Sequence, residues 1–123
     1  MQSIRWKQKD PLGRTVILKE STFREHIESD HSPADAKYRT ELERAAQSVL
    51  KEPRFIVMDS KNHGRDNYLD LAKAPAEDGS VMIKPMKVVV DKQREPHEVV
   101  TWIVQRKLSE IAKEGIVYEP VSR

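Results

Sequence analysis

A single helical stripe enclosed by two prolines constrains the fold of this chain more than any other feature. Ser32 and Pro33 have the residue types of an N-cap and a first helical position, and Pro53 stops the same segment. Between them, apolar side chains recur at three- and four-residue spacing, which predicts an amphipathic helix over about 33–52. The stripe consists of Tyr38, Leu42, Ala45 and Val49, with Ala46 and Leu50 beside it.

Short segments rich in β-branched residues lie on both sides of this helix. Before it, residues 4–8 and 14–19 flank the turn Asp10-Pro11-Leu12-Gly13 and predict a hairpin, which a short helix over about 22–29 follows. After it, strands are predicted at 54–60, 68–73, 81–90 and 97–105, and residues 107–113 and 116–118 fit a short helix and a final strand.

The order of these elements predicts the fold class. We expect an α+β fold in one domain over 1–123, with the N-terminal hairpin and two helices packed on one face of a mainly antiparallel sheet of four or five strands. Pro85 interrupts one predicted strand, which indicates an edge position or a bulge there.

Composition and motif content exclude several kinds of site. The chain has no cysteine, so it has neither a disulfide nor a thiolate metal site. Its four glycines are isolated, so a phosphate-binding loop and a dinucleotide fingerprint are both missing. The 22 basic and 20 acidic residues nearly cancel, which permits nucleic-acid binding without arguing for it. No apolar run approaches a membrane span, and residues 1–9 are too polar for a signal peptide, so we expect a cytoplasmic protein with no membrane contact.

Two of the four histidines lie close together, His26 on the short helix and His31 in the turn after it. Metal-free RNA cleavage needs a base for the 2′-hydroxyl proton, an acid for the leaving 5′-oxygen, and cations or hydroxyls near the phosphorus. Imidazole suits the first two roles because its unperturbed pKa lies near neutrality. A metal site made of His26, Asp30 and His31 is the alternative, but a His-Glu-x-x-His pattern is missing. We expect no metal and no other cofactor.

Several segments, taken in order, resemble a known family. They are TFREHIESDHSPAD, VLKEPRFIVMDS, RDNYLDLAK, KPMKVVVD and EVVTWIV, and the likeness covers about residues 14–105. Together they are similar to the phage-associated ribonuclease-like family of the superfamily that joins barnase, EndoU, colicin nuclease domains and RelE toxins. The matching positions are Phe23, His26-Ile27, His31, Pro53, Ile56, Tyr68 and Val100-Thr101-Trp102. The chain departs from the family pattern after His31, where Ser32-Pro33 stands in place of Pro-Glu.

The resemblance implies a metal-independent, ribonuclease-like domain of phage or mobile-element type with toxin-like activity. It makes His26, His31 and Thr101 the candidate catalytic residues. The candidate substrate-binding residues are Arg65, Tyr68, Lys84 and Lys87. RNA is the expected partner, together with an inhibitor or antitoxin protein.

Each candidate also has a purely structural interpretation. An aromatic residue between apolar neighbours on a strand, such as Tyr68, is usually packed in the core. A strand threonine often reflects β-propensity, and alternation predicts that Thr101 shares a face with Val99 and Ile103. His26 fits a surface histidine, and the lysines fit a solvated sheet edge. The alternative function is a catalytically inactive module of the same fold that binds RNA or protein.

Overall fold

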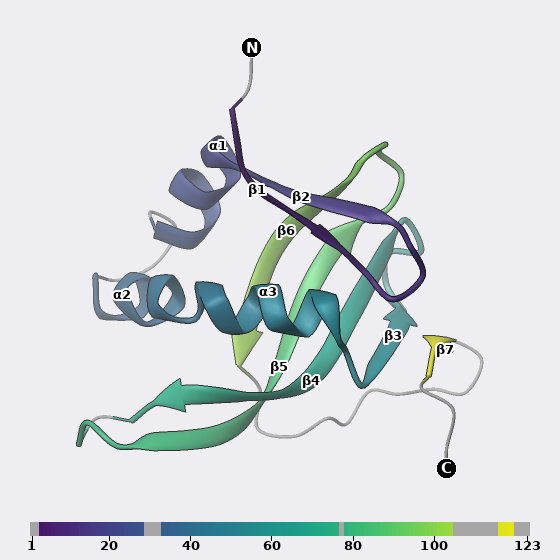
Figure 1. Ribbon diagram of the computed structural model, residues 1–123. Coiled ribbons are helices and arrows are strands. Elements are labelled where there is room, and N and C mark those ends of the chain that lie inside the picture. The colour runs from purple at the N-terminus through teal and green to yellow at the C-terminus, as the bar shows by residue number, and fades with distance from the viewer. Residues whose placement is uncertain (1–2, 29–32, 77, 105–115, 120–123) are drawn as a thin grey trace.

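The computed structural model describes residues 3–28, 33–76, 78–104 and 116–119, and it has the expected mixed α+β architecture (Figure 1). The first elements are β1 (Ile4–Lys9), β2 (Thr15–Lys19), α1 (Glu20–Thr22), the π-helix η1 (Phe23–Glu28), α2 (Pro33–Glu41) and α3 (Glu43–Lys51). The later elements are β3 (Phe55–Met58), β4 (Arg65–Pro75), β5 (Val81–Asp91), β6 (His97–Val104) and β7 (Ile116–Tyr118). His31 and the helix predicted at 107–113 lie outside the described residues.

All the strands named above belong to one sheet, in the order β1-β2-β6-β5-β4-β3-β7. The sheet therefore has seven strands rather than the predicted four or five. The difference arises because the N-terminal hairpin joins the sheet: β2 pairs in parallel with the start of β6, with Val16 opposite His97. The other neighbouring strands are antiparallel, and β7 adds to β3 at the far edge. Local alternation identifies strands, but it does not say which distant segments pair.

The helices lie on one face of the sheet, with α3 crossing in front of β4 and β5 in Figure 1. The helix predicted over 33–52 is divided at Leu42, whose φ of −89° and ψ of 3° depart from helical values. Leu42 is only 1 % exposed, so the stripe still faces the core across the break. The earlier helix begins at Glu20 and continues as η1, where Phe23 and Ile27 are both buried.

A β-bulge in β6 changes which residues face the core. Adjacent Val89 and Val90 of β5 pair with Thr101 and Val99, which leaves Val100 as an extra residue on β6. Val99 is therefore 1 % exposed on the helix side of the sheet, within the same apolar core as Trp102. The prediction that Val99 and Thr101 share a face is wrong, because the bulge interrupts the alternation. Thr101 lies on the face opposite the helices, which we call the outer face.

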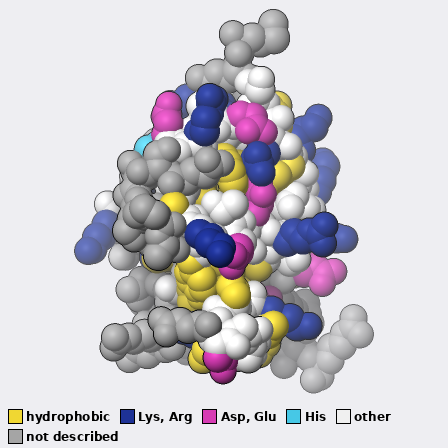
Figure 2. Space-filling model, turned by 90° about the vertical axis from the view of Figure 1, so that its left-hand side faces the viewer, with side chains coloured by type: hydrophobic (Ala, Val, Ile, Leu, Met, Phe, Trp, Pro, Cys, Tyr) yellow, Lys and Arg dark blue, Asp and Glu magenta, His cyan; other side chains and the backbone are white. Residues whose placement is uncertain are grey.

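β4 and β5 extend beyond their neighbours as a two-stranded arm. Within the described residues, β3 pairs with β4 only as far as Leu69, and β6 pairs with β5 only from Met86 onward. In the described part of the chain, residues 71–75 and 81–85 therefore pair only with each other. The arm exposes apolar side chains, with Val81 65 % and Ile83 59 % exposed. Figure 2 shows hydrophobic side chains gathered in the lower half of the side from which the arm projects.

The two edges of the arm each carry a proline. On β4, the Leu69 carbonyl accepts a hydrogen bond from the Arg54 amide at 2.9 Å, so odd-numbered residues direct their backbone groups away from β5. Pro75 belongs to this odd-numbered set, and its missing N–H would have pointed to the open edge. The loss of that donor removes one site at which another strand could pair.

The backbone groups of β5 alternate in the same way as those of β4. The Trp102 carbonyl accepts from Arg39 and not from β5, so its partner Val88 directs its backbone groups toward β4. Odd-numbered residues of β5 then point toward the β6 side, where the described residues of β6 end opposite Met86. Within the described residues, Pro85 therefore has no partner on β6, as the prediction of an edge position requires.

We expect the double variant P75T/P85T to self-associate more strongly than the wild type, because threonine supplies an edge N–H at each position. Sedimentation velocity over a range of protein concentrations would measure the change. M82T is the matched control, since it adds a threonine to the arm at a position whose N–H faces β4. Identical sedimentation of P75T/P85T and the wild type would contradict the protective role of the prolines.

Candidate functional site at the open edge of β6

The outer face of the sheet brings together three of the predicted site residues. They are Thr101 on β6, Lys87 on β5 and Arg65 on β4. Thr101 is opposite Val89, two residues from Lys87, so the side chains of Thr101 and Lys87 are diagonal neighbours. This arrangement places a hydroxyl and an ammonium group on the same surface.

The other predicted substrate-binding residues lie elsewhere. Lys84 is opposite the buried Ala72 on the helix side of the arm, away from Lys87. Tyr68 is 0 % exposed on the helix side, in the apolar core. The structure therefore does not unite Lys84 or Tyr68 with the outer-face residues.

Arg39 of α2 covers the edge of β6 beside Thr101. β2 pairs only with His97 and Glu98 of β6, so the described part of the sheet leaves the later residues of this edge without a strand partner. The Arg39 Nη1 donates to the Trp102 carbonyl at 2.9 Å and to Thr101 Oγ1 at 3.3 Å. In return, the Trp102 indole Nε1 donates to the Arg39 carbonyl at 2.9 Å. One guanidinium thus joins α2 to the strand and lies against the threonine hydroxyl.

The π-helix η1 packs against the same strand. It contacts both β6 and α2, and the ring of its buried Phe23 lies 6.4 Å from the ring of Trp102. His26, three residues after Phe23, is exposed on η1. Two candidate catalytic residues, His26 and Thr101, therefore lie on elements in direct contact. Single-turn π-helical segments occur frequently at functional sites, which agrees with this position.

A second cluster of polar side chains on the outer face includes Asn67. Its Nδ2 donates to Asp59 Oδ2 at 3.2 Å, and Asp59 also accepts from the amides of Lys61 and Asn62. Burial alone would raise the pKa of Asp59, but these hydrogen bonds and the charge of Lys87 bring it below the ordinary value. The Asn67 amide oxygen is buried and accepts no hydrogen bond within the described residues. This arrangement fixes the carboxylate beside Lys87 in its ionised form.

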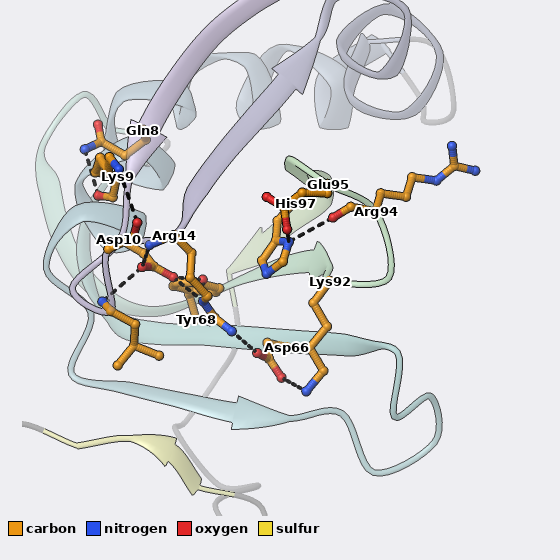
Figure 3. A network of polar contacts seen from close by, with 12 residues as sticks. Gln8, Lys9, Asp10, Arg14, Asp66, Tyr68, Lys92, Arg94, Glu95 and His97 are labelled. Carbon is orange, nitrogen blue, oxygen red and sulfur yellow. Dashed lines mark hydrogen bonds and ion pairs between the residues drawn. The ribbon is translucent and has the colours of Figure 1, made fainter.

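The helix side of the sheet contains a separate network of charged residues, drawn in Figure 3. Arg14 donates through Nε to Asp10 Oδ2 at 2.8 Å and through Nη1 to Asp66 Oδ2 at 3.2 Å. Lys92 donates to the other oxygen of Asp66 at 2.8 Å. Both carboxylates have fully buried side chains. The two positive and two negative charges of the network balance. Its contacts join the β1–β2 turn to β4 and to the loop after β5.

Tyr68 belongs to this network. Its hydroxyl donates to Asp10 and accepts from Arg14 Nη2 at 2.8 Å. Burial raises the pKa of the Tyr68 phenol, the bond to Asp10 raises it further, and the positive charge of Arg14 only partly opposes the shift. The phenol stays protonated as a structural donor. The geometry favours the core interpretation of Tyr68 over phosphate binding.

Sequence reasoning missed Arg39, Asp59 and Asn67. Arg39 is separated from Thr101 by 62 positions, so no local spacing links them. Asn67 left no signal, since it stands directly before the strand predicted at 68–73, where a turn asparagine is ordinary. The structure instead begins β4 at Arg65, which places Asn67 within the strand.

The described residues contain no group of three or more His, Cys, Asp or Glu side chains placed to bind a metal ion, and Asp30 and His31 lie outside them. None of the described helices is long and apolar enough to cross a membrane. Comparison with protein-family models, curated proteins and solved structures finds no match to this chain. The resemblance to the ribonuclease-like family therefore stays a prediction.

Proposed function

We propose that this protein binds RNA and cleaves it without a metal ion at the open edge of β6. The observation that carries the proposal is the contact of Arg39 with Thr101, on a strand that also packs against η1. RNA cleavage needs an acid-base group, a hydrogen-bond donor and a cation around one phosphate. His26, Thr101 and Arg39 supply one of each.

In the proposed reaction, an imidazole takes the proton from the 2′-hydroxyl, and O2′ attacks phosphorus while the bond to the 5′-oxygen breaks. A protonated acid gives its proton to that oxygen, so the products are a 2′,3′-cyclic phosphate and a free 5′-hydroxyl. His26 serves as one of these groups, and His31 supplies the second imidazole. Thr101 and Arg39 stabilise the negative charge on the non-bridging oxygens. Lys87 and Arg65 contact adjacent phosphates across the outer face.

Incubation with RNA in EDTA tests the proposal. The wild type is expected to cleave, and H26A is expected to lose roughly 10²–10⁴-fold in rate, which is the usual contribution of a general acid or base. H63A is the matched control, because His63 is exposed in the turn between β3 and β4. H63A is expected to cleave at the wild-type rate. No cleavage by the wild type would exclude the enzymatic function.

A catalytically inactive module that binds RNA or protein is the second candidate function. The observation that favours it is that Arg39 already engages the Thr101 hydroxyl in a contact that stabilises the fold. Binding of uncleaved RNA that weakens as salt rises would support an RNA-binding module. A salt-insensitive interaction with an inhibitor or antitoxin protein would support a protein-binding one.

A further inference from the structure

Among the described residues, the hydroxyl of Thr101 has a donor beside it but no acceptor. A guanidinium N–H can only donate, so the 3.3 Å contact with Arg39 Nη1 occupies a lone pair of Thr101 Oγ1. The hydroxyl hydrogen must then point away from Arg39. Within the described part of the chain, no backbone or side-chain oxygen accepts it. A half-buried hydroxyl at the edge of β6 therefore presents an O–H donor that none of the described residues uses.

Arg39 is fixed at both ends by Trp102. Its side chain donates to the Trp102 carbonyl at 2.9 Å, and its own carbonyl accepts from the Trp102 indole at 2.9 Å. Trp102 is 0 % exposed, so this reciprocal pair is anchored in the core. The guanidinium is therefore held in one place, and it determines the direction of the threonine O–H.

We propose that Arg39 and Thr101 form one anion-binding unit, in which Arg39 orients the Thr101 hydroxyl to donate to a non-bridging phosphodiester oxygen. The inference rests on the proposed RNA-cleaving function and names the group that recognises its scissile phosphate. Arg39 is a positioning residue, and its positive charge polarises the hydroxyl and attracts the same anion. Both contacts come from Nη1, and lysine is a poor replacement because its strongly hydrated ammonium ends a flexible stem instead of a planar guanidinium.

The test measures binding of a fluorescent oligoribonucleotide to the H26A protein in EDTA, so that the RNA stays intact. T101V and R39M are each expected to weaken binding about 10-fold, as expected for loss of a charge-assisted hydrogen bond. The double variant R39M/T101V is expected to bind about as weakly as R39M alone, because the hydroxyl is no longer oriented. T101S retains the hydroxyl and is expected to restore most of the affinity.

The salt dependence of RNA binding separates the effect of the Arg39 charge from the effect of the Thr101 hydroxyl. R39M is expected to reduce the slope of log affinity against log salt by about 1, whereas T101V leaves the slope unchanged. R44M is the matched control, because Arg44 is an exposed arginine on α3 outside the proposed site. R39K provides a second variant that keeps the charge while losing the fixed planar donor, and it is expected to make a further T101V change nearly silent.

The possible failures are distinguishable. Additive effects, with R39M/T101V about 100-fold weaker than the parent, would show that the two residues act independently and would overturn the inference while RNA binding stands. Absence of RNA binding by both the wild type and H26A would overturn the proposed function and the inference together.

Discussion

Replacement of Trp102 by alanine is expected to lower the free energy of unfolding by about 3–5 kcal/mol, the range for deletion of a large aromatic core side chain. Trp102 is 0 % exposed, and its ring packs against Phe23 at 6.4 Å with a tilt of 47°. Its loss would also leave the Arg39 carbonyl without the indole donor. A loss of this size is a large fraction of the stability of an ordinary domain.

The other tryptophan provides the control. Trp6 is only partly buried, and its indole donates to Glu43 at 2.9 Å. Because less apolar area leaves water at this position, W6A is expected to cost roughly half as much as W102A or less. Urea unfolding followed by far-UV circular dichroism would measure both variants without depending on tryptophan fluorescence. Equal losses would show that the full burial of Trp102 does not give it a larger share of the stability than Trp6.

The sequence predicted the parts of the fold that depend on local periodicity. The stripe containing Leu42 and Val49 faces the core, and Gly13 takes the positive φ of 80° that its turn requires. The parallel pairing of β2 with β6 could not be predicted, because it joins residues such as Val16 and His97 that share no local pattern. The bulge at Val100 also escaped detection, since it shows no glycine or other turn residue in the sequence.

The sequence also predicted only part of the candidate site. Residue type and order indicated His26 and Thr101 as site residues, and the structure places them on η1 and β6, which are in contact. The group that completes this site, Arg39, lies on the polar side of a helix and is indistinguishable in sequence from other solvated arginines. Tyr68 shows the reverse case, because a strand tyrosine fits phosphate binding as well as core packing, although core packing is the more usual role. Only the positions of Asp10 and Arg14 separate the two roles.

Asp10 illustrates how much of this molecule depends on side-chain contacts that bridge distant segments. It appears in the sequence only as the first residue of a turn, and its carboxylate accepts from the backbone amides of Leu12 and Arg14 at 3.0 and 2.8 Å. The same carboxylate also accepts from the Arg14 guanidinium and from Tyr68, across 58 positions of the chain in the second case. We expect D10N to lower the free energy of unfolding at pH 7 by about 3 kcal/mol, near the lower end for breaking a buried ion pair, since Arg14 retains Asp66.

The effect of D10N should depend on pH in a defined direction. Burial alone would raise the pKa of Asp10, but hydrogen bonds from Tyr68 and Arg14 outweigh burial and bring it below the ordinary value of 3.8. The carboxylate therefore stabilises the fold fully above pH 3.8, and this contribution is lost as the pH falls, because the unfolded chain binds the proton first. Urea unfolding between pH 7 and pH 3 should show the difference between D10N and the wild type shrinking in acid. D78N, which changes an exposed turn carboxylate that accepts from Ser80 in its own loop, is expected to change the free energy of unfolding much less than D10N does. A difference for D10N that stays constant down to pH 3 would mean that the charge of Asp10 does not join the turn to the sheet.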